Sequence, residues 1–146
     1  LACAAAGVQP EARRLDPMEL PADLAPFDAV LFLGVFYHLR NPIPVMEALG
    51  RLTAQVCVVE THQNALEEVR PAMIFYPWNE LDGDATNWWG PNPPLMTALL
   101  LGAGFTRIRY RPNPTTGPSR GIYAAFKPDA PAALLEGYRD WEVLVP

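Results

Sequence analysis

Lysine is almost absent from this sequence, and acidic residues outnumber basic ones. The 146 residues include 11 lysines and arginines, of which only Lys127 is a lysine, against 16 aspartates and glutamates, for a net charge of −5. A protein whose main task is to hold a phosphate backbone usually presents a basic stripe. The composition therefore argues against such a protein, although a local arginine patch on an acidic domain stays compatible with nucleic-acid binding.

Cysteine is also scarce. Cys3 and Cys57 are the two cysteines, and both lie in apolar stretches without a nearby partner. This usage predicts free, buried thiols and a cytoplasmic protein rather than a disulfide framework. The spacing of the cysteines and histidines matches no zinc site, so we predict no metal.

Long apolar runs are missing as well. The longest, residues 29–37, is too short for a bilayer, which needs about 20 residues. Residues 1–8 are apolar, but no basic region precedes them, so we interpret them as a helix remnant closed by Gly7 rather than a signal peptide.

Apolar residues nevertheless make up half of the chain, which excludes disorder as the ground state. The length fits one domain over residues 1–146. Seventeen prolines divide the chain. Apolar runs predict strands over residues 27–35, 55–60, 105–110 and 121–126, with a weaker one over 11–15. Start signals and apolar spacing predict helices over 41–53, 95–101 and 134–141.

These elements predict an α/β fold with three layers and a terminal antiparallel strand pair. The strand at 27–35 is apolar almost throughout, which is typical of a central strand covered on both faces. In the helix at 41–53, Ile43, Met46, Leu49 and Leu52 recur every third residue and are predicted to form its buried face. Residues 61–94 form a long aromatic, turn-rich segment, and loops of that length are usually functional.

Polar groups gather where the first two strands end. In α/β sheets, ligands bind beyond the carboxyl ends of the strands. The residues at this predicted rim are Gly34, Tyr37, His38 and Arg40 after the first strand, and Glu60 and His62 at the end of the second. They define a candidate site.

Two segments carry a resemblance to a known family. The stretch FDAVLFLGVFYHLRNP resembles the fourth-strand region of class I S-adenosylmethionine (SAM) dependent methyltransferases. The later DATNWWGPN, followed by a helix and GAGF, is similar to one branch of that superfamily, which includes the enzymes that methylate or carboxymethylate a tRNA wobble uridine. The resemblance covers residues 16–126. It implies a Rossmann-like half-sheet, SAM as cofactor, and a small molecule or a tRNA base as substrate.

The sequence departs from that family at its beginning. The family's glycine-rich turn after the first strand, and the acidic residue that closes the second, have no counterpart here. The cofactor contacts that the resemblance still implies are Asp16, Leu33, Gly34 and Tyr37. Of these, Asp16 matches the family's residue that reads the adenine amino group. We expect either a truncated copy or gene fragment, or a protein whose missing half comes from elsewhere.

The catalytic candidates are His38 and Glu60. His38 has a side chain suited to proton transfer, but it could equally hold the strand–helix turn. Glu60 could orient a substrate hydroxyl or amine, or be a solvated carboxylate. Tyr37 could line the methionine end of the cofactor or pack beneath the next helix. Arg40 could face a substrate carboxylate or phosphate, or simply start that helix in solvent.

The substrate candidates besides Arg40 belong to one cluster in the long segment: Asn87, Trp88, Trp89 and Asn92. Adjacent indoles could stack on a planar substrate such as a base. They could also anchor the loop by burying apolar area, and the fixed turn that Gly90 and Pro91 suggest favours anchoring.

The sequence thus predicts a SAM-dependent methyltransferase-like protein, with a non-catalytic interaction module as the alternative. The predicted sheet order is first, second, fourth and third strand, with the fourth antiparallel. Because the strand at 27–35 would lack its neighbour, we expect a homodimer through that edge, with residues 11–15 covering part of the gap.

Overall fold

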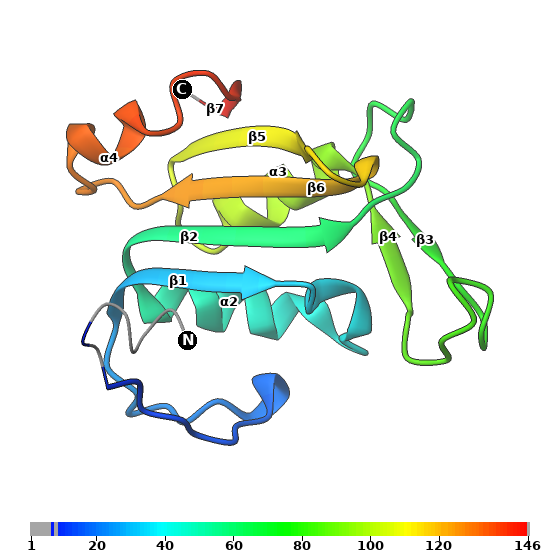
Figure 1. The fold of residues 1–146 in the computed structure, drawn as a ribbon, viewed down its shortest axis with the longest axis horizontal. Coiled ribbons are helices and arrows are strands. Elements are labelled where there is room, and N and C mark those ends of the chain that lie inside the picture. Colours follow the sequence, from blue (N-terminus) through cyan, green and yellow to red (C-terminus); the bar gives the residue numbers. More distant parts are fainter. Residues whose placement is uncertain (1–6, 8, 146) are drawn as a thin grey trace.

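The computed structural model describes residue 7 and residues 9–145. The predicted helix remnant before Gly7, and Cys3 within it, lie outside the described residues. Figure 1 shows one sheet of five strands in the order β1-β2-β6-β5-β7, with helices packed on it. The strands of this sheet are β1 (Phe27–Leu33), β2 (Thr53–His62), β5 (Arg107–Asn113), β6 (Gly117–Phe126) and β7 (Glu142–Val145). The other elements are η1 (Pro17–Glu19), η2 (Phe36–His38), α2 (Pro42–Leu52), β3 (Met73–Phe75), β4 (Trp89–Pro91), α3 (Pro93–Gly102) and α4 (Ala132–Glu136).

The predicted α/β class and topology are confirmed. β1 runs parallel to β2, β6 runs antiparallel to β2, and β5 runs antiparallel to β6. The predicted helix at 134–141 is wrong in its second half. It ends at Glu136, and residues 142–145 form β7, which pairs with β5. The alternation of Val143 and Val145 suits a strand, and the free edge of β5 supplies its partner.

The main core lies between the sheet and the helices α2 and α3. α2 buries Val45, Met46, Leu49 and Leu52 against it. The prediction that Ile43 shares this face is wrong, because 55% of Ile43 is exposed. Three residues turn a helix by only about 300°, so a series at every third position drifts around the axis and its first member leaves the buried face.

A smaller core lies on the opposite sheet face. There, residues of α4 and the segment after it cover Val56, Ala124 and Phe126 of β2 and β6. The three predicted layers are therefore present, but the third layer does not extend over β1. Leu31 is 68% exposed and Leu33 is 50% exposed.

β1 is consequently an edge strand in the described part of the chain. The prediction that both of its faces are covered is wrong, because Phe32 is the only residue of β1 that is buried. Along its length β1 pairs with β2 on one side, and no described strand pairs with it on the other.

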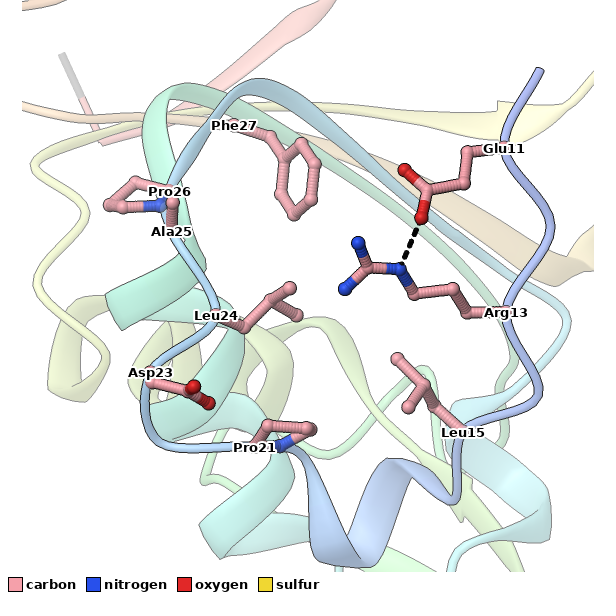
Figure 2. Close-up of a pocket in the computed structure, with 9 residues that line it drawn as sticks. All are labelled: Glu11, Arg13, Leu15, Pro21, Asp23, Leu24, Ala25, Pro26 and Phe27. Carbon is pink, nitrogen blue, oxygen red and sulfur yellow. Dashed lines mark hydrogen bonds and ion pairs between the residues drawn. The ribbon is translucent and has the colours of Figure 1, made fainter.

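The predicted strand over residues 11–15 is also wrong. These residues form no ladder and instead border a cavity of about 820 Å³ beside the start of β1. Figure 2 shows Leu24 and Phe27 facing this cavity from one side and Arg13 from the other, with Arg13 paired to Glu11 at 2.6 Å. The segment lacks β-branched residues and carries exposed charges, so little favours a strand there.

The long segment after β2 contains a short hairpin of β3 and β4 that stands against η2. The Trp88 amide donates to the Tyr37 carbonyl at 2.7 Å, and the Tyr76 amide donates to the Trp88 carbonyl at 2.9 Å. The hairpin is thereby fixed beside the predicted rim.

Two further observations concern membrane-spanning helices and the thiol of Cys57. No helix in the described part of the chain is long and apolar enough to span a bilayer. Cys57 is free and buried in the main core, and burial raises the pKa of its thiol to about 12.

Candidate functional site

The carboxyl ends of β1 and β2 lie side by side, as predicted. Leu33 is in register with Glu60, and the Gly34 amide donates to the Glu60 carbonyl at 3.0 Å. Gly34 has φ +70°, a conformation that L-residues with side chains rarely adopt, and it turns the chain from β1 into η2. A Cβ atom at Gly34 would lie 3.6 Å from the Tyr37 hydroxyl and 3.7 Å from Arg120 Nη2.

Arg120 is the central residue of this rim, and sequence reasoning missed it. Its Nε donates to Glu60 Oε1, its Nη2 donates to Glu60 Oε2 at 2.8 Å, and Nη2 also donates to the Tyr37 hydroxyl at 3.2 Å. The guanidinium carbon lies 5.0 Å from the centroid of the Tyr37 ring. The hydrogen bonds to Glu60 raise the pKa of Arg120, so it stays charged. We name Gly34, Tyr37, Glu60 and Arg120 the rim cluster.

The rim cluster is arranged to hold an anionic or carbonyl group. A guanidinium has five N–H donors. Those on Nε and Nη2 have acceptors in Glu60 and Tyr37, whereas Nη1 has no acceptor within the described residues. Because the ion pair fixes the guanidinium plane, a ligand oxygen near Nη1 would meet an oriented donor.

The same geometry restricts Glu60. Its carboxylate is 12% exposed and is held by both arms of the Arg120 fork. Such a carboxylate orients the arginine. Glu60 is therefore not the solvated carboxylate considered as one alternative, and in the structure its contacts position Arg120, a role that the sequence did not indicate.

His38 is the last residue of η2, and the centroid of its ring lies 4.3 Å from that of Tyr37. Its Nδ1 is 2.9 Å from the Thr86 carbonyl oxygen and 3.1 Å from Thr86 Oγ1, and that hydroxyl in turn donates to Asp84. A carbonyl can only accept, so Nδ1 of His38 donates. In neutral His38 the remaining nitrogen, Nε2, is then the proton acceptor.

His62 is the last residue of β2, and its side chain is neutral. Its Nε2 lies 3.1 Å from the Tyr76 hydroxyl, which also accepts a hydrogen bond from Asn64. Burial lowers the pKa of His62, and the charge of Arg120 lowers it further. The prediction that His62 lies at the same rim as Glu60 is confirmed by the register, in which His62 faces Arg120.

The aromatic cluster divides into two parts. Trp88 stacks on Phe75 with ring centroids 6.2 Å apart, and the guanidinium carbon of Arg40 lies 4.8 Å from the Trp88 centroid. These residues border a cavity of about 540 Å³ on the hairpin, which Trp78 also lines. Trp88 and Arg40 therefore stay available to a ligand.

The other three members of the predicted cluster serve the fold. Trp89 packs against the main core and its indole donates to the Leu39 carbonyl at 2.9 Å. Asn92 is fully buried, caps α3 and bonds to backbone groups of residues 68, 70 and 72. Asn87 is buried and donates to the Leu81 carbonyl at 3.0 Å. We do not retain these three as substrate contacts.

Asp16 lies apart from this arrangement. Its carboxylate caps η1 by accepting from the Met18 amide at 2.9 Å, and no described contact joins it to Gly34 or Tyr37. The described residues also contain no cluster of three or more His, Cys, Asp or Glu side chains able to hold a metal ion.

The fold of the described residues is also found in solved structures, SAM-dependent methyltransferases among them. The [4+2]-cyclase SpnF superposes with a TM-score of 0.59 at 14% identity, over 87% of this chain and 60% of that one. A SAM-dependent methyltransferase from Mesorhizobium loti superposes with a TM-score of 0.58 at 13% identity, over 86% of this chain and 74% of that one. EvdMO1 superposes with a TM-score of 0.54 at 24% identity, over 86% of this chain and 27% of that one.

Among curated proteins, the chain is similar to tRNA U34 carboxymethyltransferases. It is 32% identical over 98 residues to the protein from Pseudomonas putida and 33% identical over 97 residues to that from Trichlorobacter lovleyi. Each match covers 62% of this chain and 28% of the relative, so the chain spans less than a third of those proteins. No protein-family model matches. The predicted resemblance to class I methyltransferases, and to their tRNA wobble-uridine branch, is confirmed.

Proposed function

We propose that this chain forms one part of a SAM-dependent transferase whose substrate is a tRNA base. The observation that carries the proposal is the rim cluster, an oriented arginine beside a left-handed glycine at the carboxyl ends of two parallel strands. That is where α/β folds bind ligands. The similarity to tRNA U34 carboxymethyltransferases favours a tRNA base over a small molecule, and a tRNA substrate agrees with the cytoplasmic location that cysteine usage predicts.

The described residues fit one end of SAM. Gly34 leaves open the space that a Cβ would take beside Tyr37 and Arg120, and Leu33 next to it is half exposed. We propose that Leu33, Gly34 and Tyr37 hold the amino-acid end of the cofactor. Asp16 is the candidate for the adenine end, although it is engaged in capping η1. The described chain holds no glycine-rich turn, so polypeptide beside β1 would complete the site.

Bound SAM supplies an electrophilic methyl group, and holding donor and acceptor in line accounts for much of the rate of such a transfer. In this proposal Arg120 orients the bound ligands, Glu60 and Tyr37 fix Arg120, and His38 accepts a proton from the substrate through Nε2.

A non-catalytic interaction module is the second candidate. The open edge of β1 favours it, because an edge with unpaired backbone groups and exposed leucines recruits another strand. Where no other polypeptide occupies that edge, we propose that two copies of the chain pair through β1 about a two-fold axis, since a strand paired antiparallel with its own copy satisfies both edges at once.

Calorimetric titration of the chain with SAM tests the transferase proposal. We expect heat of binding at micromolar affinity, and weaker binding by Tyr37→Phe, which removes the hydroxyl beside Gly34. Tyr138→Phe is the matched control, because Tyr138 lies in the smaller core on the opposite sheet face. Absence of heat at millimolar SAM would overturn the proposal and favour the interaction module.

A further inference from the structure

The hairpin carries an exposed aromatic pocket that the rim cluster does not explain. The pocket encloses about 540 Å³ and is lined by Arg40, Phe75, Pro77, Trp78, Ala85 and Trp88. Phe75 and Trp88 lie nearly parallel, with 16° between their ring planes. The pocket therefore offers flat apolar surfaces of the size of an aromatic ring.

Trp78 is held in a conformation that serves no packing purpose. It is 80% exposed, and its backbone has φ +54°, a left-handed conformation that is unfavourable for a bulky residue. An indole in water gives up the burial that makes tryptophan stabilising. Two unfavourable features at one residue point to a ligand that covers the ring.

The charged residues around the pocket favour one kind of ligand over another. Arg40 contacts the Trp88 ring, and it has no ion-pair partner in the described ranges. Its guanidinium can therefore donate to carbonyl oxygens of a bound ring. The same loop carries Glu80, Asp82 and Asp84, which repel phosphate groups. The pocket suits a neutral planar ring with carbonyl acceptors better than a phosphate backbone.

The pocket is connected to the rim cluster through η2. Trp88 is hydrogen-bonded to Tyr37 through its backbone amide, and Arg40 follows η2 by two residues. Tyr37 thus joins the rim cluster to the segment that carries the pocket.

We propose that this pocket binds an unpaired nucleobase of the RNA substrate, which stacks on the exposed ring of Trp78 while Arg40 donates to a base carbonyl. The inference rests on the proposed function for the identity of the substrate as RNA. It adds a contact to a base next to the modified one. Base–aromatic stacking is tolerant of sequence and can provide affinity where phosphate contacts are few.

The test is fluorescence anisotropy, without SAM, using a short RNA hairpin with an unpaired uridine-containing loop and a fully paired RNA of the same length. We expect the looped RNA to bind the full chain more tightly than the paired one, with a weak dependence on salt. Trp78→Ala removes an exposed side chain and should lower the affinity about tenfold. Arg40→Gln should lower it several-fold.

Arg111→Gln is the matched control, because Arg111 lies over Trp141 at 5.3 Å in the same kind of pair elsewhere on the sheet. Equal affinity for both RNAs, unchanged affinity in Trp78→Ala, or an equal loss in Arg111→Gln would overturn the inference. Loss of self-association in Trp78→Ala with unchanged RNA affinity would do the same and assign the surface to a protein contact. If the chain binds SAM but its affinity for RNA does not depend on Trp78, only this inference is contradicted. If the chain binds RNA through Trp78 but does not bind SAM, only the proposed SAM-dependent transferase is contradicted.

Discussion

β1 and β2 are neighbouring parallel strands with similar apolar sequences and opposite surroundings. β2 has a paired strand on each side, and Val56, Cys57 and Val59 are buried. β1 has one paired side, and Leu31 and Leu33 are at least half exposed. The difference shows that an apolar run encodes a strand suited to burial, while its neighbours decide whether it is buried.

The comparison also explains where the site lies. The ends of both strands contribute to the rim cluster, but the side of β1 away from β2 is open in the described part of the chain. A ligand at Gly34 would be held by β2 and β6 from one side only. Substitutions that are expected to have different effects in β1 and β2 therefore test this account.

The largest effect is expected from placing a charge at a buried position of β2 rather than at an exposed position of β1. Val59→Asp puts a carboxylate into a fully buried position of β2, and we expect the free energy of unfolding to fall by about 4 kcal/mol or more. Leu31→Asp on the exposed face of β1 should change it by about 0.5 kcal/mol or less at protein concentrations too low for two copies to associate. Urea denaturation followed by circular dichroism measures both, and similar losses would contradict the difference between the strands.

A smaller effect is expected at the ion pair that joins β2 to β6. Glu60→Gln removes a partly buried partner of Arg120 and should cost about 1–3 kcal/mol. Glu68→Gln breaks the exposed pair with Arg70 and should cost less than about 0.5 kcal/mol. The same denaturation experiment compares them. Equal losses in the free energy of unfolding would mean that the ion pair of Glu60 and Arg120 stabilises the fold no more than an exposed ion pair does.

The smallest effect is a pH dependence at the end of β2. The pKa of His62 lies below its ordinary value of 6.5 in the folded chain, so the unfolded chain binds more protons as the pH falls past that value. The contribution of neutral His62 to stability is complete above pH 6.5 and is lost as the pH falls toward its folded pKa. Stability of the wild type should therefore drop more than that of His62→Gln between about pH 7 and pH 5.5. Parallel curves would contradict the cause given for the shift.

Much of the fold could be predicted from the sequence because local patterns determine it. The apolar runs located β1, β2, β5 and β6, and the turn-rich connection between the last two indicated their antiparallel pairing. β7 was missed because its four residues form a strand only where the edge of β5 receives them. The face of α2 was misjudged at Ile43, because a spacing of three does not match the period of the helix.

The candidate site was predictable only in part, for a physical reason. Gly34, Tyr37 and Glu60 follow strands, so the rule for carboxyl ends located them. Arg120 lies just before the predicted strand at 121–126, and antiparallel register alone brings it to the same edge. Pairing that strand with the end of β2 would have identified it. The structural roles of Asn87 and Asn92 depend on backbone groups of the loop itself, which no local pattern reveals.

The central claim is that β1 is built to have a neighbour on its open side. Light scattering at tens of micromolar protein tests it most directly, with amide hydrogen exchange across residues 27–33 measured on the same sample. The account predicts a mass near twice the 16.1 kDa of one chain and protected β1 amides, and a mass near 16.1 kDa for Leu31→Asp. A wild-type mass of 16.1 kDa with unprotected outward amides of β1 would contradict it.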